Sequence, residues 1–263
     1  MDFAGEAVSL AELLDERRHL LDVAYRMVGS DGEAEGVVVE TYRRWYALSD
    51  TARAQIATPR SWLAATAGGI CRARQDLPGR SGNPAQDTER ADFAGGNAFG
   101  TAPAAVADAV GKGRPGSLAP AARACRWLRS WRARTASPVR HDALVTAVRE
   151  ACAAEDAGLL ASLLAADATA VFDGGGKVRA LVRPVHGSEQ VARSLLVLLA
   201  RRPRTTLRAQ PVSGRTGLVV RCDHQVAAVI SLGLTGDRVG RVGQVWVVLN
   251  PDKLRPWNES PAS

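Results

Sequence analysis

The chain has 263 residues, a hydrophobic content of 46% and a net charge of +7. This length suffices for two domains of ordinary size, each with its own apolar core. No apolar run approaches the ~20 residues of a membrane span, and the acidic N-terminus lacks the basic and apolar segments of a signal peptide, so we expect a cytoplasmic protein with no membrane partner.

The four cysteines, Cys71, Cys125, Cys152 and Cys222, stand far apart in the sequence. They form no CxxC pair and no repeated spacing with histidine, which metal sites and disulfide frameworks normally show. The sequence therefore predicts no metal site, and we expect the cysteines to be small buried side chains.

The N-terminal segment predicts a helix that begins after Ser9 and ends at Gly29. Ser9 and Glu12 have the spacing of a capping box, in which each side chain caps the backbone N–H of the other residue. Apolar residues recur on one face of this helix. They are Leu10, Leu13, Leu14, Leu20, Leu21, Ala24 and Met27 or Val28.

Two more helices are expected at short intervals, which predicts a compact bundle. One spans about residues 32–48. Its inward residues are Ala34, Val37, Val38, Thr41, Trp45 and Leu48. Its outward residues are Glu33, Glu35, Glu40, Arg43 and Arg44. The other helix begins at Thr58 and Pro59, a cap residue followed by the proline that suits a first turn. Its apolar face carries Trp62, Leu63, Thr66 and Ile70.

The second and third helices contain the stretches EAEGVVVETYRRW and PRSWL. They resemble region 2 of an extracytoplasmic-function sigma factor of the sigma-70 family, whose second helix reads close to DAEDVVQETFLRW and binds RNA polymerase. The resemblance implies a polymerase-binding face with Glu35, Glu40, Arg43 and Arg44. Gly36 and Val39 replace a carboxylate and an amide on this face. We expect each loss to weaken docking by roughly 1 to 3 kcal/mol.

The third helix resembles the part of region 2 that engages the −10 promoter element. The resemblance implies phosphate contacts from Arg60, Arg72 and Arg74, and a base-capturing loop at residues 49–57. The alternative for Arg43, Arg44 and Arg60 is a solvated helix face, and for Trp45 and Trp62 it is core packing. Two glycines at 68 and 69 fall inside the third helix, where each costs about 1 kcal/mol relative to alanine.

The middle of the chain has two distinct compositions. Residues 79–118 are rich in glycine, proline and alanine and predict a flexible linker. Residues 119–136 are basic and resemble the last helix of sigma region 4, which implies DNA contacts from Arg123, Arg126 and Arg129. The preceding helices of region 4 are missing, so no helix-turn-helix would hold this helix in a major groove. The alternative is packing of its tryptophans against a neighbouring domain.

Residues 139–255 predict an α+β domain, followed by a tail at 256–263. Helices are expected at 141–153, 156–164 and 188–202, and strands at 169–173, 178–185, 206–213, 217–222, 226–235 and 238–249. This order predicts a curved antiparallel sheet wrapped around helices, which encloses a cone. It resembles the SnoaL-like group of the NTF2 superfamily.

Two short motifs, DGGGK and NPDKL, sharpen this resemblance. Their residues are Asp173, Gly174, Gly175, Gly176, Lys177, Asn250, Pro251, Asp252, Lys253 and Leu254. They resemble signatures of the sigma-factor subgroup with a fused SnoaL-like extension, which contacts the sigma core and modulates its activity. We interpret the two motifs as an interdomain latch. On physical grounds, we expect Lys253 to pair with Asp173 or with a carboxylate of the helical domain. The alternatives are a tight hairpin turn for DGGGK and a turn for NPDKL.

The sequence thus predicts a multidomain protein with an all-α sigma region 2 bundle at 1–78 and an α+β SnoaL/NTF2-like cone at 139–255. Its predicted function is that of a bacterial sigma-factor-like transcription regulator. It would bind core RNA polymerase or promoter DNA without a cofactor, and its SnoaL-like domain would modulate this binding. The alternative is a degenerate sigma paralogue that no longer reads promoters and binds another regulator or a small ligand.

Catalysis is the least favoured alternative. A SnoaL-type enzyme places a general base inside the cone. The candidates Asp173, His186, Asp223 and His224 fall beside turns rather than at inward strand positions. No catalytic residue is therefore assigned.

Overall fold

The computed structural model describes residues 8–75, 137–200, 203–235 and 240–259. The expected linker and the region 4 remnant, with Cys125, Arg123, Arg126 and Arg129, lie outside the described residues. Met1–Arg74 and Ala136–Ser263 together form one compact unit. Within the described ranges, no helix is both long enough and apolar enough to cross a membrane.

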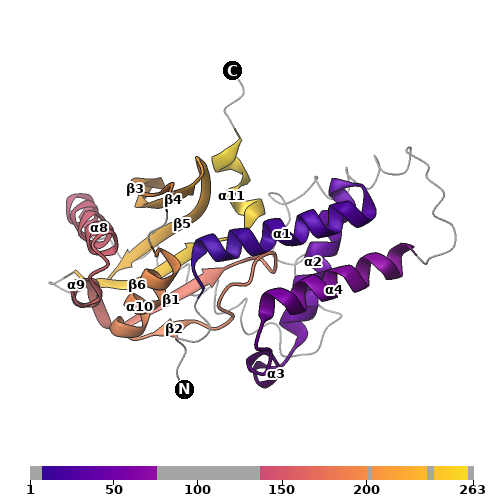
Figure 1. The fold of residues 1–263 in the computed structure, drawn as a ribbon. Helices are drawn as coiled ribbons and strands as arrows, with labels where there is room; N and C mark the ends of the chain where they lie inside the picture. The colour runs from indigo at the N-terminus through magenta and orange to yellow at the C-terminus, as the bar shows by residue number, and fades with distance from the viewer. Residues whose placement is uncertain (1–7, 76–136, 201–202, 236–239, 260–263) are drawn as a thin grey trace, which may run out of the picture. The chain divides into compact units, whose positions relative to one another are not determined.

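The helical part consists of four helices, drawn from indigo to purple in Figure 1. They are α1 (Leu10–Val28), α2 (Asp31–Ala47), α3 (Asp50–Ala54) and α4 (Pro59–Gln75). Both expected ends of α1 are confirmed. Ser9 and Glu12 form the capping box, and Gly29 ends the helix with a φ of 72°, a left-handed conformation that suits glycine.

The first helix contributes to two different cores. Leu10 and Leu13, near its start, belong to the core of the α+β part. Leu20 and Ala24, two turns further on, belong to the core of the helical part. A single rigid helix therefore connects the packing of the two parts.

The core of the helical part is built mainly from α2 and α4. Val37 and Val38 from α2 are fully buried, as is Leu63 from α4. Trp45 and Trp62 pack edge to face, with ring centroids 5.4 Å apart. Core packing thus describes both tryptophans, and α4 runs through its two glycines without a break.

The expected loop at residues 49–57 is partly wrong, because five of its residues form α3. Ser49 caps this short helix by accepting a hydrogen bond from the backbone N–H of Ala52 at 3.2 Å. Serine followed by aspartate is a helix start signal as well as a loop signal. The start signal decided the conformation here.

The α+β part contains four helices and six strands among its described residues (Figure 1). The helices are α8 (Pro138–Ala153), α9 (Ala157–Leu163), α10 (Ser188–Leu198) and α11 (Pro251–Asn258). The strands are β1 (Leu164–Asp173), β2 (Val185–His186), β3 (Thr205–Val212), β4 (Arg215–Cys222), β5 (Gln225–Leu234) and β6 (Val242–Val248).

The strands form one sheet in the order β2-β1-β6-β5-β4-β3. All neighbours are antiparallel except β1 and β6, which are parallel. The expectation of a wholly antiparallel sheet was therefore wrong. The first and last long strands pair across most of the domain, and no local pattern reports such a pairing.

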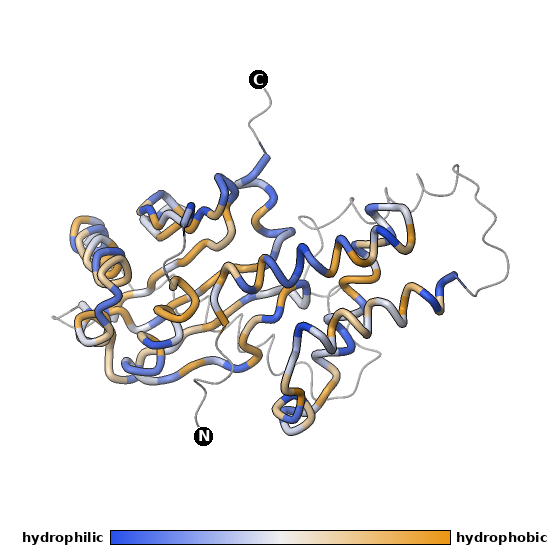
Figure 2. The backbone as a smooth tube through the Cα atoms, viewed as in Figure 1, coloured by the Kyte–Doolittle hydropathy of each residue, from blue (hydrophilic) through white to orange (hydrophobic). Residues whose placement is uncertain are grey.

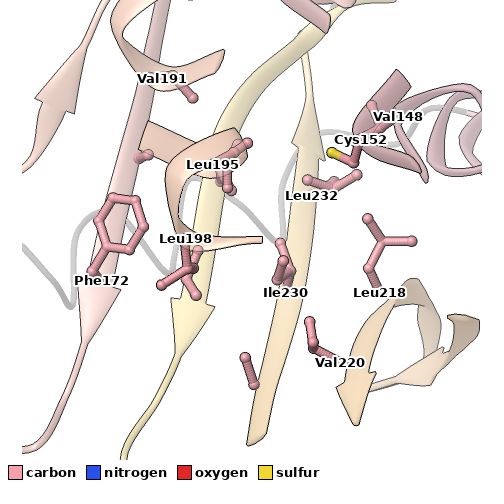
Figure 3. Close-up of a cluster of buried hydrophobic side chains, with 14 of the residues drawn as sticks. Val148, Cys152, Phe172, Val191, Leu195, Leu198, Leu218, Val220, Ile230 and Leu232 are labelled. Carbon is pink, nitrogen blue, oxygen red and sulfur yellow. The ribbon is translucent and has the colours of Figure 1, made fainter. Parts of the chain in front are cut away.

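The main core lies between the sheet and the helices α8 and α10. Figure 3 shows Val148 of α8, Leu195 of α10 and Ile230 of β5 converging from these elements. Cys152 also points into this core, and burial raises its thiol pKa to about 12. Cys71 is likewise buried and Cys222 is half-buried, so the described cysteines fit the expectation of small packed side chains.

Three further expectations differ from the structure. The segment 178–185 is irregular until the two residues of β2. The helix expected to reach residue 202 ends at Leu198. NPDKL is not a turn but the start of α11, where Asn250 caps the helix and Pro251 occupies its first position. Figure 2 shows that α11 is mostly hydrophilic, whereas the strands are mostly hydrophobic.

Candidate interdomain site

The two motifs contact one another in the structure. Asp173 ends β1 and its Oδ1 accepts a hydrogen bond from the backbone N–H of Gly175 at 3.0 Å. Its Oδ2 lies 2.6 Å from Lys253 Nζ, which confirms one of the two expected partners of that lysine. A Cβ on Gly175 would lie 2.1 Å from the side-chain nitrogen of Asn250. Only glycine leaves room for this contact, so the two motifs form one interlocked structure.

From Lys177, the last residue of DGGGK, the chain runs toward the helical part as far as Arg183. We call these residues the 177–183 segment. Lys177 Nζ lies 2.7 Å from Asp252 and 3.5 Å from Glu35 on α2. Arg17 on α1 donates a hydrogen bond to the carbonyl of Lys177 at 3.1 Å and lies 2.6 Å from Glu35. Glu35 is thereby held between α1 and the 177–183 segment.

Tyr46 on α2 binds the backbone of the same segment. Its hydroxyl donates to the carbonyl of Val178 at 2.5 Å and accepts from the N–H of Ala180 at 3.0 Å. Burial raises the pKa of Tyr46 to about 12. The hydroxyl therefore keeps its proton at neutral pH and can make both bonds.

A buried ion pair lies at the centre of this contact. Arg179 Nε is 3.0 Å from Glu16 on α1, whose side chain is only 3% exposed. The Tyr42 hydroxyl donates to the same carboxylate at 3.2 Å. Burial raises the pKa of Glu16, and the facing Arg179 offsets only part of this effect.

The far end of the 177–183 segment reaches α3. Arg183 pairs with Asp50, which also pairs with Arg53. The side chains of Arg183 and Asp50 are 65% and 48% exposed. Since exposed ion pairs are weak and readily exchanged, this end of the segment is the less firmly held.

The residues predicted to bind polymerase fall into two groups. Glu35 is engaged by Arg17 and Lys177, as described above. Glu40, Arg43 and Arg44 form a cluster of their own, with Glu40 lying 2.8 Å from Arg43 and 3.2 Å from Arg44. The hydrogen bond from Arg43 lowers the pKa of Glu40, and both arginines are exposed.

The residues predicted to bind DNA are also divided. Arg60 and Arg72 are exposed on α4. Arg74 instead donates to the carbonyl of Glu33 at 3.3 Å, and a Cβ on Gly36 would lie 3.4 Å from its guanidinium. Gly36, which replaces a carboxylate of the family pattern, therefore lies beside the Arg74 guanidinium.

Sequence reasoning missed the residues that make most of these contacts. They are Glu16, Arg17, Tyr46, Arg179 and Arg183. Glu16 carried a signal, because it falls on the apolar stripe of α1 between Leu13 and Leu20. A charged residue at an inward position normally has a partner. The other four residues carried no signal that a single sequence reveals.

The candidates for catalysis do not gather at one site. Asp173 is paired with Lys253, and His186 is exposed on β2 beside Thr169. Asp223 and His224 are exposed at the turn between β4 and β5. A hollow where α1, α10 and β1 meet, lined by Leu13, Leu198 and Phe172, has a volume of about 10 Å³, room for about one water molecule.

Comparison with known proteins gives one informative relative. No family model matches the chain. The chain is 27% identical to the ECF RNA polymerase sigma factor SigJ of Mycobacterium tuberculosis, in an alignment covering 90% of each protein. This alignment has 292 positions against the 263 residues here. Some segments of SigJ are therefore missing from this chain.

Two solved structures show only weak overall similarity. The crystal structure of SigJ is 25% identical, covers 94% of this chain and 98% of SigJ, and has a TM-score of 0.35. A bacterial protein with a cystatin-like fold from Silicibacter pomeroyi is 19% identical, covers 42% of this chain and 76% of its own, and has a TM-score of 0.32. By sequence, the chain is therefore similar to an extracytoplasmic-function sigma factor over a span too long to be confined to either its helical or its α+β part.

Proposed function

We propose that this protein is a sigma-factor-like regulator of transcription initiation that works in the cytoplasm. Its helical part binds core RNA polymerase and promoter DNA, and its α+β part controls that binding through the 177–183 segment. The sequence similarity to SigJ across nine tenths of both chains supports the transcriptional role. The contacts of the 177–183 segment support control of this binding by the α+β part.

One observation carries the regulatory part of this proposal. The 177–183 segment contacts both surfaces that the resemblance assigns to transcription. It holds Glu35 on the expected polymerase-binding face through Lys177, and it holds Asp50 in the expected base-capturing segment through Arg183. A group that is paired within the chain is not free to pair with polymerase or to move toward DNA.

The geometry favours release of the outer ion pairs of the 177–183 segment rather than complete separation of the helical part from the α+β part. Glu35 and Asp50 lie at the accessible edges of the contact, with side chains 35% and 48% exposed. A polymerase side chain can replace Lys177 or Arg183 there without exposing apolar surface. The buried pair of Glu16 and Arg179 would stay in place, so the two parts remain attached while the binding faces open.

Co-purification with core RNA polymerase tests the proposal. The native chain is compared with Gly36→Asp/Val39→Gln, which restores the two polar groups of the family pattern. An ideal Cβ at residue 36 lies 3.4 Å from the Arg74 guanidinium, the end of a flexible side chain that can move aside, so the variant should fold and leave the new carboxylate available to polymerase. We expect detectable binding by the native chain and several-fold tighter binding by the variant. The proposal is wrong if neither protein binds core polymerase.

The alternative is a degenerate sigma paralogue that no longer reads promoters, and the replacements at Gly36 and Val39 favour it. Under that reading the chain binds a regulator that normally meets an intact sigma factor, and it initiates no transcription. Promoter-directed transcription with purified core polymerase separates the two readings. Transcripts with a defined start site support sigma activity, whereas polymerase binding without transcripts supports the degenerate regulator.

A further inference from the structure

We propose that the outer face of the β3–β4 hairpin is a second, sequence-independent binding surface for the phosphate backbone of duplex DNA. This inference rests on the proposed function, which brings the protein to DNA. We call the surface the basic face. Its basic residues are Arg204, Arg208, Arg215 and Arg221.

The strand register places Arg208, Arg215 and Arg221 on one side of the sheet, and Arg204 directly precedes β3. Arg221 lies opposite Thr206, and Arg208 lies opposite Val219. Cross-strand partners point to the same face, so Arg208 and Arg221 are diagonal neighbours roughly 7–8 Å apart. The alternate residues Leu207, Leu218 and Val220 pack with the main core instead. The basic face is thus on the side of the hairpin turned away from α8. Val212 and Val219, which lie opposite Arg215 and Arg208, are buried there with Leu254 of α11, so the arginines border a small apolar cluster.

The end of the hairpin forms an open hollow. Its lining residues are Arg204, Thr206, Arg208, Arg221, Asp223 and His224. Three of them, Arg204, Asp223 and His224, adopt left-handed backbone conformations with φ values of 66°, 49° and 71°. Asp223 and His224 are the two loop residues of the β4–β5 hairpin, where positive φ values at both positions are the ordinary geometry of a tight turn.

The charge of the hairpin is strongly unbalanced. Residues 203–224 contain four arginines and a single acidic residue, Asp223. The pair between Asp223 and Arg204 is 3.5 Å long, and both side chains are more than half exposed, so it neutralises little. Among the described residues, Arg208 and Arg215 have no carboxylate partner. A dense polyanion is the ligand that matches such a surface.

Duplex DNA fits this surface better than a small anion does. The arginines run along the length of two strands rather than converging on one point, and β3 is the edge strand of the sheet. A phosphate backbone presents a row of charges that such a line of arginines can follow. The contact would add affinity without sequence preference, which suits a chain whose helix-turn-helix is expected to be missing.

A salt titration of duplex binding tests the inference in the full chain. Fluorescence anisotropy measures the affinity for two labelled duplexes of unrelated sequence, without polymerase, for the native chain and for Arg208→Ala/Arg221→Ala. The matched control is Arg149→Ala/Arg193→Ala, which removes the same charge from α8 and α10 on the other side of the sheet. Arg208→Glu serves as a second variant, because Arg221 also donates to the carbonyl of His224 at 3.2 Å.

We expect the basic-face variant to bind both duplexes roughly tenfold more weakly at 0.1 M salt. The slope of log affinity against log salt should fall by about 2, or about 1 for each lost phosphate contact. Arg208→Glu should show a loss in the same direction, and the control should change little. An equal loss in the control, or no loss in either basic-face variant, overturns the inference.

Polymerase co-purification of the same variants keeps the two proposals apart. Unchanged polymerase binding together with weaker DNA binding supports the basic face as a DNA surface. Loss of polymerase binding with unchanged DNA binding assigns the surface to an acidic protein instead and overturns the inference. Neither of these results alters the separate test of the proposed function with Gly36→Asp/Val39→Gln.

Discussion

The 177–183 segment has a buried middle and an exposed rim, and the two differ in what they can do. In the middle, Arg179 meets a carboxylate that is 3% exposed, and Tyr46 bonds two backbone groups of the segment. At the far end, Arg183 and Asp50 meet in solvent. The comparison indicates that attachment and regulation are carried by different residues of one short segment.

The difference follows from the cost of leaving each group without a partner. A buried carboxylate or carbonyl that loses its partner pays a desolvation penalty, so its bonds persist. An exposed group exchanges its partner for water or for another protein at little cost. We therefore expect changes in the middle to lower stability, and changes at the rim to alter binding.

The largest effect is expected from Arg179→Met. This change removes the guanidinium and leaves Glu16 buried without its cation. We expect the free energy of unfolding to fall by about 3 kcal/mol, with uptake of a proton by Glu16 limiting the loss. Chemical denaturation of the native chain and the variant measures this loss.

The double variant Glu16→Gln/Arg179→Met provides the control. The glutamine carries no charge and can still accept the bond from Tyr42, so much of the lost stability should return. Losses that simply add in the double variant would show that the two side chains do not interact in solution.

A smaller effect is expected from Tyr46→Phe. The change leaves the carbonyl of Val178 and the N–H of Ala180 without their partner, while the aromatic ring stays in place. We expect a loss of about 1 to 2 kcal/mol in thermal or chemical unfolding. Tyr25→Phe, at an exposed position on α1, is the matched control and should be neutral. Equal behaviour of the two variants would contradict the role of Tyr46.

The pH dependence of stability reports on Glu16. Its pKa is raised above the ordinary value of 4.5 by burial, so the folded state holds this proton more tightly than the unfolded state does. The contribution of Glu16 to the free energy of unfolding should therefore rise as pH falls through the raised pKa toward 4.5, and level off below it. Glu40 has a lowered pKa, so its contribution to stability changes with pH in the opposite direction. Because Glu40 is present in both proteins, the difference in unfolding free energy between the native chain and Glu16→Gln isolates the contribution of Glu16. A difference that falls on acidification would contradict the raised pKa.

The smallest effect on stability is expected from Arg183→Ala. Both partners of this ion pair are well exposed, so the free energy of unfolding should change by less than about 1 kcal/mol. Hydrogen exchange should nevertheless become faster at residues 50–54, where α3 loses its contact with the α+β part. Unchanged exchange in α3 would show that the rim contact is not formed in solution.

The helical part was largely predictable from the sequence. The capping box, the apolar stripes and the glycine stop are local signals, and they gave α1, α2 and α4 almost to the residue. The motifs DGGGK and NPDKL were also recognisable, and the pairing of Lys253 with Asp173 was among the expected contacts.

The remainder depends on partners that are far away in the chain. Alternating apolar residues made 178–185 resemble a strand, but Tyr46, more than 130 positions earlier, takes the backbone groups of Val178 and Ala180. Glu16 and Arg179 are 163 positions apart, so neither indicates the other in a single sequence. For α11, the signal was present, since Asn250 before Pro251 is a helix start as well as a turn.

The most direct test of the account is the affinity for core RNA polymerase when the rim alone is released. Lys177→Ala/Arg183→Ala removes the two cations by which the 177–183 segment contacts Glu35 and Asp50. It leaves the pair of Glu16 and Arg179 and the pair of Arg17 and Glu35 intact. Arg149→Ala/Arg193→Ala again serves as the charge-matched control. We expect Lys177→Ala/Arg183→Ala to bind core polymerase several-fold more tightly than the native chain and the control do. Equal or weaker binding by this double variant would contradict the proposed control by the 177–183 segment.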